Sequence, residues 1–220
     1  YGGGELVRVE KNTVVTIGGT PKEDETISNT KFKPTIWGSV FGAGKGVETH
    51  GYSALVRGNS NVTIQGFAKV GQSVYGGGEI ASIGRYNVVD GRPTSLKNPN
   101  SGNCIVTVRD NAEIGPDNMT MFHVNENGDI VDNDQPCNSG HVFGAGKGAM
   151  PGDYKTAEQM TNGNTLDGFT SEDDYLKFIE SLGLATQTKV TIGGNAFVKG
   201  DIFGGAEQGF VQHDTHVIIE

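Results

Sequence analysis

The sequence has no long apolar run and no basic segment, and both absences limit what the protein does. No stretch approaches the ~18–20 consecutive apolar residues of a membrane-spanning helix. The net charge is −9, and no stripe of Lys and Arg is present to contact a nucleic-acid backbone. We therefore expect neither membrane insertion of this segment nor binding of nucleic acid.

Cysteines and metal-binding patterns are also sparse. The chain has two cysteines, Cys104 and Cys137, and neither belongs to a zinc-binding pattern. They flank a loop-like segment, so a disulfide in an exported protein and two buried free thiols both fit the sequence. No pair of histidines has metal-ligand spacing on an expected helix, and no Ser–His–Asp arrangement can be identified. We expect no cofactor and assign no catalytic residues.

Glycine, in contrast, is abundant: 35 of the 220 residues are glycine, and many recur in one motif. This motif, which we name the corner motif, starts with an aromatic residue, continues with three small residues and ends with a charged residue. Its five copies are residues 1–5 (YGGGE), 41–45 (FGAGK), 75–79 (YGGGE), 143–147 (FGAGK) and 203–207 (FGGAE). The chain opens inside this motif without a signal peptide, so we expect a segment of a longer repeat protein.

The two FGAGK copies have the Gly-Lys pair of a phosphate-binding loop, but the surrounding spacing fails. Such a loop reads G-x-x-x-x-G-K-[ST], in which the final hydroxyl holds magnesium. Glycines follow both lysines, and Ser39 and His141 stand where the first glycine is required. The motif therefore does not indicate nucleotide binding.

A second motif, of the type VTI, alternates with the corner motif. Val62 lies 12 residues before Val74, Val190 lies 12 residues before Ile202, and the shortest complete unit is about 26 residues. The short strands of one unit bury too few side chains to fold alone, so the units must stack. We predict an all-β fold: a right-handed parallel β-helix of about five turns, with residues 1–220 forming a single segment.

Stacking the corner motifs produces two columns of side chains. The aromatic column consists of Tyr1, Phe41, Tyr75, Phe143 and Phe203. The charged column, which alternates in sign, consists of Glu5, Lys45, Glu79, Lys147 and Glu207. Opposite charges on adjacent strands attract each other, so we interpret both lysines as partners of the glutamates, with an active-site lysine as the alternative.

Four long polar insertions separate the repeats, at residues 19–36, 81–102, 116–139 and 149–187. Insertions of this kind usually carry the binding functions of repeat proteins. The last one contains one short helix, near 171–183, with Ser171 as its N-cap. Its apolar face consists of Tyr175, Phe178, Ile179 and Leu182. We expect this helix to dock on the flank of the stack, with partner binding as the alternative.

The insertion at 116–139 carries a dense group of oxygen-bearing side chains. The candidate ligands are Asn125, Asp129, Asp132 and Asp134. Hard oxygen ligands suit calcium, but the ligand order of an EF-hand and the nonapeptide of calcium-binding β-rolls are both absent. A calcium site and a solvated polar loop therefore both remain open.

The single tryptophan, Trp37, precedes the second corner motif. We predict that it packs in the core or caps an edge of the stack, and a platform for a sugar is the alternative.

The segment NVTIQGFAKVGQSVYGGGE, residues 61–79, resembles the Gly-rich β-helix repeats of very large adhesin-like surface proteins of anaerobic gut bacteria. The likeness covers the repeat cores along the chain but not the insertions. It implies a secreted or cell-surface protein whose partners are flanking repeats and, through the loops, a glycan or a host surface protein. Exposed end strands also predict end-to-end self-association.

The broader pectin-lyase-like group shares this superfold, which brings a second hypothesis. Carbohydrate-active members attack acidic polysaccharides with clustered Asp or calcium and a basic residue. Such a set cannot be mapped onto this sequence, because no acids recur on adjacent repeats outside the charged column. We expect a non-enzymatic structural or adhesive segment, with a polysaccharide lyase or glycoside hydrolase as the alternative.

Overall fold

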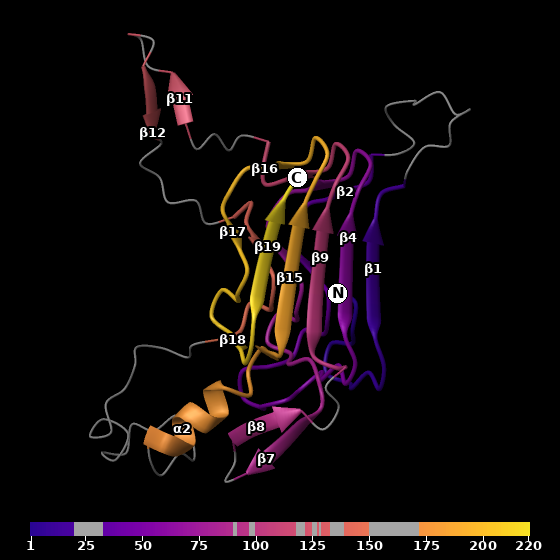
Figure 1. Ribbon diagram of the computed structural model, residues 1–220, viewed down its shortest axis with the longest axis vertical. Helices are drawn as coiled ribbons and strands as arrows, with labels where there is room; N and C mark the ends of the chain where they lie inside the picture. The colour runs from indigo at the N-terminus through magenta and orange to yellow at the C-terminus, as the bar shows by residue number, and fades with distance from the viewer. Residues whose placement is uncertain are drawn as a thin grey trace.

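The computed structural model of the chain (Figure 1) is built mainly from β-strands that pair in parallel. It describes residues 1–19, 33–89, 92–96, 100–117, 122–124, 127, 129–132, 139–149 and 172–220. The expected mostly β, parallel character of the chain is confirmed.

The largest sheet contains the five VTI strands, which lie side by side in sequence order (Figure 1). These strands are β1 (Thr13–Ile17), β4 (Ser60–Ile64), β9 (Asn103–Val108), β15 (Gln187–Ile192) and β19 (Thr215–Ile219). The register repeats without a slip, so that Val15, Val62 and Val106 are direct partners. Equivalent residues of successive repeats are therefore neighbours in space.

Two further parallel sheets contain two-residue strands from the same repeats. One consists of β2 (Thr35–Ile36), β5 (Lys69–Val70), β10 (Glu113–Ile114) and β16 (Phe197–Val198). The other consists of β3 (Val40–Phe41), β6 (Val74–Tyr75), β13 (Val142–Phe143) and β17 (Ile202–Phe203). A fourth set of parallel contacts joins Val9 to Val56, Val56 to Ile83, and β14 (Leu184–Ala185) to β18 (Phe210–Val211).

The three sheets share one apolar core. Along β4, Ser60, Val62 and Ile64 are buried while the intervening residues face outward, as the period-two pattern of a strand requires. The inward valines and isoleucines of all three sheets form one cluster, and most of them are fully buried. Burial of each such side chain stabilises the fold by about 1.5–3 kcal/mol, so stacking provides the stability that one repeat lacks.

The first glycine of the corner motif is required because backbones approach closely there. A Cβ added to Gly76 would overlap the carbonyl oxygen of Gly144 and lie 2.8 Å from Cγ2 of Val106. The same overlap recurs between Gly42 and the carbonyl of Gly76. Only glycine fits these positions, whereas the next motif position also holds a fully buried alanine, Ala43, in the second copy.

The insertions carry the remaining regular structure. Two antiparallel hairpins are present, β7 (Tyr86–Val89) with β8 (Arg92–Leu96) and β11 (Phe122–Val124) with β12 (Ile130–Asp132). They lie beyond opposite ends of the strands of the large sheet (Figure 1), β11–β12 past the carboxyl ends and β7–β8 past the amino ends. These hairpins were not expected from the sequence, because the insertions lack the regular alternation of the repeats.

The expected short helix is present as α2 (Glu172–Ile179), and Ser171 lies outside the described residues. Its apolar residues Tyr175 and Ile179 are buried, as is Leu182 beyond its end. The backbone after the helix is held at Ser181, whose carbonyl accepts hydrogen bonds from the Ser82 hydroxyl (2.8 Å) and the Tyr52 amide (3.2 Å). The helix is therefore docked on the body of the molecule. Among the described residues, no helix is long and apolar enough to cross a bilayer.

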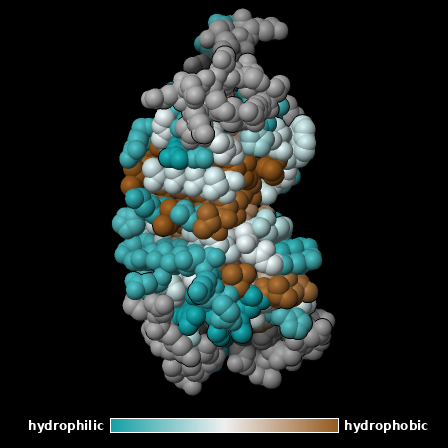
Figure 2. All heavy atoms as spheres, turned by 90° about the vertical axis from the view of Figure 1, so that its right-hand side faces the viewer, coloured by the Kyte–Doolittle hydropathy of each residue, from teal (hydrophilic) through white to brown (hydrophobic). Residues whose placement is uncertain are grey.

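The β1 end of the molecule displays apolar side chains in bands between polar ones (Figure 2). Exposed residues in this part of the chain include Leu6, Val7 and Val14. β1 and β19 are the outer strands of the large sheet, and among the described residues no strand pairs with the outer edge of either.

The substitution Gly76→Ala should destabilise the protein strongly, because the new methyl group has no space between two backbones. The expected loss in the free energy of unfolding is about 1–3 kcal/mol or more, measured by chemical denaturation. The matched control is Gly205→Ala, in the last corner motif, where no atom lies within 4 Å of an added Cβ. Equal stability of the two variants would contradict the close approach at Gly76.

Candidate functional site

The aromatic residues of the corner motifs form one continuous stack. Successive rings are 4.7–5.0 Å apart between centroids and within 6–9° of parallel. This separation matches the spacing of neighbouring strands, about 4.8 Å, so the register of the backbone fixes the stack. The three central rings, Phe41, Tyr75 and Phe143, are buried. The column thus packs the repeats against one another, and the faces of these three rings are covered by their neighbours in the stack.

The charged residues of the corner motifs follow the same register. The amides of Lys45, Glu79, Lys147 and Glu207 donate to backbone carbonyls of the preceding copy at 2.9–3.2 Å. Lys45 Nζ lies 3.0 Å from Glu5 Oε1, and the hydrogen bond and charge of Glu5 raise the pKa of Lys45. Both side chains are substantially exposed, so this pair adds little stability.

Two tyrosine hydroxyls contact glutamates two copies further along, a feature that the sequence pattern did not reveal. The Tyr1 hydroxyl donates to Glu79, and the Tyr75 hydroxyl donates to Glu207. Partial burial, followed by these carboxylates, raises the pKa of both tyrosines above the ordinary value. One feature of the sequence could have indicated these contacts. Tyrosine occurs together with glutamate in both YGGGE copies, whereas the FGAGK copies have phenylalanine, which lacks the hydroxyl.

A column of small polar side chains in the core donates hydrogen bonds to the carbonyls of the corner glycines. Thr13 Oγ1 donates to the carbonyl of Gly42 at 2.6 Å, and Ser60 and Thr188 donate to the carbonyls of Gly76 and Gly204. Cys104 stands in the same register between Ser60 and Thr188. Cys104 is fully buried, and burial raises the pKa of its thiol to about 12, which makes it unreactive at neutral pH. Cys137 lies outside the described residues, so a disulfide between the two stays a prediction.

A groove of about 410 Å³ opens on the outer side of the β2–β5–β10 sheet. Its lining includes Trp37, Lys69, Gln72, Asp117 and Ser139. The tryptophan is 82% exposed, so the prediction that it packs in the core is wrong. It follows β2 directly and points outward, because the neighbouring Ile36 packs against the core.

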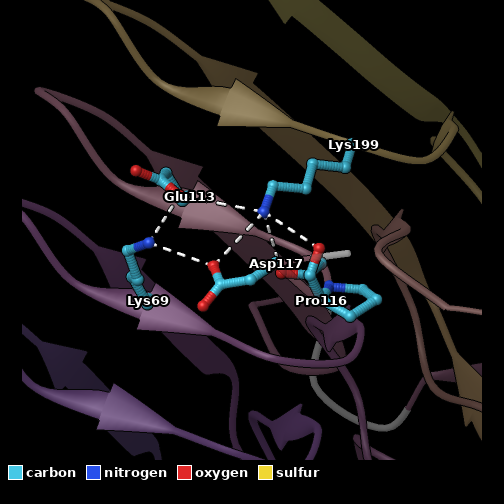
Figure 3. Close-up of polar contacts among 6 residues, drawn as sticks. Lys69, Glu113, Pro116, Asp117 and Lys199 are labelled. Carbon is cyan, nitrogen blue, oxygen red and sulfur yellow. Dashed lines mark hydrogen bonds and ion pairs between the residues drawn. The ribbon is translucent and has the colours of Figure 1, made fainter. Parts of the chain in front are cut away.

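Four charged side chains beside the groove form a connected cluster (Figure 3). Lys69 Nζ lies 3.0 Å from Glu113 Oε2 and 3.1 Å from Asp117 Oδ1. Lys199 Nζ donates to the backbone carbonyls of Gly115 (3.4 Å) and Pro116 (3.0 Å) and lies 3.7 Å from Asp117. Two positive and two negative groups meet, so the cluster as a whole is close to neutral.

The cluster is poorly suited to proton transfer. The hydrogen bonds of Glu113 and Asp117 raise the pKa of Lys69, and the hydrogen bond and charge of Lys69 lower the pKa of Asp117. A general acid or base works best when its pKa lies near the working pH. Both pKa shifts run away from neutral pH, so neither Lys69 nor Asp117 is tuned for proton transfer there.

The proposed calcium ligands are only partly described. Asp132 ends β12 and pairs with Phe122, and Asp129 precedes the same strand. Asn125 and Asp134 lie outside the described residues. Within the described ranges, no group of three or more His, Cys, Asp or Glu side chains is close enough to hold a metal ion. The calcium site therefore stays a prediction.

The chain matches no protein-family model, and comparisons with curated proteins and with solved structures also found no match. The geometry of the described residues is therefore the basis on which a function can be assigned.

Replacement of Lys69 by methionine should raise the pKa of Asp117 toward the ordinary value for aspartate, about 3.9. In the folded wild type the ionised carboxylate is favoured. Its contribution to stability is thus present above the unfolded-state pKa and is lost as the pH falls through the lower folded-state value. The measurement is an NMR titration of the Asp117 carboxyl carbon.

The control for this titration is Lys189→Met, which removes an exposed lysine from β15 on the large sheet. It should leave the pKa of Asp117 unchanged. An Asp117 pKa that is the same in wild type and Lys69→Met would contradict the contact shown in Figure 3.

Proposed function

We propose that the chain is a non-enzymatic structural and adhesive segment of a secreted or cell-surface bacterial protein. In this proposal it coils as a right-handed parallel β-helix of about five turns and presents its insertions and outer grooves to partners.

The order in which the chain visits its sheets supports this coil. It passes through β4, β5 and β6, and then through β9, β10 and β13, which are their respective neighbours. A parallel connection of this kind is right-handed in nearly all proteins. Stacking of equivalent residues is thus the expected outcome of repeating one short coil.

The main support for a structural role is that charged residues of the corner motifs contact residues of other copies. Lys45 contacts Glu5, while Glu79 and Glu207 accept hydrogen bonds from tyrosines of other copies. These four charged side chains, Glu5, Lys45, Glu79 and Glu207, each contact a side chain of another copy along the stack. This pattern fits cohesion between repeats better than it fits a catalytic lysine.

The second candidate is a polysaccharide lyase or glycoside hydrolase on the same scaffold. It would need a carboxylate or lysine whose pKa is tuned toward the working pH. In the groove beside β5 the pKa of Lys69 is raised and the pKa of Asp117 is lowered, so both move away from a neutral working pH. The groove therefore favours the non-enzymatic proposal.

The proposed partners follow from the exposed edges and grooves. The outer edges of β1 and β19 suit further repeats of the same kind, or a second copy of the chain. A glycan or host surface protein would bind at the outer surface, and an extracellular or cell-surface location is part of the proposal.

The chain should not cleave polysaccharides. The test incubates the folded protein, with and without calcium, with a panel of polyuronates and neutral polysaccharides, and it follows new reducing ends and unsaturated uronate. No release above a heat-treated sample is expected. Cleavage that is lost in Asp117→Asn or Lys69→Met would replace the proposal with the enzymatic alternative.

A further inference from the structure

We propose that the groove beside Trp37 is a binding site for a neutral pyranose residue of a glycan. Trp37 provides the stacking surface, and Gln72 and Asp117 provide hydrogen bonds to sugar hydroxyls. The inference rests on the adhesive part of the proposed function and assigns it a site and a ligand class.

The groove arises from one row of residues that follows the short sheet. This row consists of Trp37, Gly71, Gly115 and Lys199, which come directly after β2, β5, β10 and β16. Backbone hydrogen bonds align it: the amides of Gly71, Gly115 and Lys199 donate to the carbonyls of Ile36 (2.6 Å), Val70 (2.7 Å) and Ile114 (3.0 Å). The two glycines between two long side chains leave the hollow of the groove.

The main chain of Trp37 passes close to the neighbouring repeat while its ring is exposed. Gly71 allows the main chain of Trp37 to pass closely, because a Cβ on Gly71 would lie 2.7 Å from the Trp37 carbonyl oxygen. The tryptophan itself is 82% exposed. The adjacent residue Ile36 is tied to the next repeat by the hydrogen bond from the Gly71 amide, and the exposed indole offers a flat surface on which the apolar C–H face of a pyranose can stack.

Polar groups suited to sugar hydroxyls lie in the same groove. Gln72 Oε1 accepts a hydrogen bond from Ser39 Oγ at 3.1 Å, which fixes the carboxamide whose NH₂ group can donate to a ligand. The Asp117 carboxylate is largely exposed, and both lysines approach its Oδ1, which leaves the acceptor sites of Oδ2 for a ligand. An aromatic surface with a few placed polar groups is the usual composition of a small-molecule site.

The charge balance selects a neutral ligand. The two lysines of the cluster are engaged: Lys69 with Glu113 and Asp117, and Lys199 with two backbone carbonyls. The Lys199 side chain is only 9% exposed, and its stem lies over Gly115. A uronate or phosphate would meet the Asp117 carboxylate without an unengaged cation among these groups. The volume, about 410 Å³, falls in the lower part of the range for ligand sites, which suits one or two sugar rings.

The single tryptophan makes the site directly observable. The folded chain is titrated with neutral disaccharides of glucose, galactose, mannose and N-acetylglucosamine, and with galacturonate oligomers, while tryptophan emission and heat of binding are recorded. We expect a saturable change in emission with at least one neutral sugar, and at least tenfold weaker binding of the uronates. Acrylamide should quench the free protein strongly, because the ring is exposed.

Three variants separate binding from folding. Trp37→Ala should weaken calorimetric binding more than tenfold at an unchanged melting temperature, and Trp37→Phe should retain part of it. Val14→Ala, which trims another exposed apolar side chain, should leave binding unchanged. Asp117→Asn should weaken binding without loss of fold.

Four results would overturn the inference. These are no binding of any neutral sugar at millimolar concentration, tighter binding of uronates, unchanged affinity in Trp37→Ala, and a free indole that acrylamide cannot reach because another segment of the chain covers it. None of them affects the structural role. Conversely, sugar binding followed by cleavage would remove the non-enzymatic proposal and leave the binding site in place.

Discussion

The close approach of glycine backbones at the corner motif is the constraint on which the rest of the structure depends. In the first four copies, the first glycine lies where a Cβ would overlap a carbonyl oxygen of the following copy, as Gly42 does with Gly76. No other residue fits, so the motif can pack in one register only. Hydroxyls of Thr13 and Ser60 donate to these same glycine carbonyls and satisfy them inside the core.

Once the corners are in register, every other position becomes a column. Aromatic rings stack at the spacing of the strands, charged residues alternate, and inward valines form a continuous core. The same rule applies on the outside, in the row that begins with Trp37 and ends with Lys199. Its two glycines, Gly71 and Gly115, lie where an added Cβ would be within 3.0 Å of the Trp37 carbonyl oxygen and of the Lys199 Cβ, and the groove opens where they leave no side chain.

The repeat pattern was sufficient to predict parallel strands and the residues that stack. When the register is fixed, residues at the same position of successive repeats become neighbours in space. The helix near Tyr175 was also predictable, from its apolar spacing. Three features were not. Trp37 was expected to pack in the core or to cap an edge of the stack, but it follows the inward Ile36 and is largely exposed. The reach of Tyr75 to Glu207 depends on side-chain length across two copies, and the hairpins lie in insertions without a periodic pattern.

The most direct test of this account is an engineered disulfide across the large sheet, in a background of Cys104→Ser and Cys137→Ser. Asn61 and Ile105 are outward-facing register partners, so their Cα atoms should be about 4.8 Å apart, within the range for a disulfide. Asn61 and Thr107 are two residues out of register, at about 8 Å, beyond that range. The account predicts rapid, complete oxidation of the pair Asn61→Cys with Ile105→Cys, and little of the pair Asn61→Cys with Thr107→Cys. Equal oxidation of both pairs, or preference for the second, would contradict it.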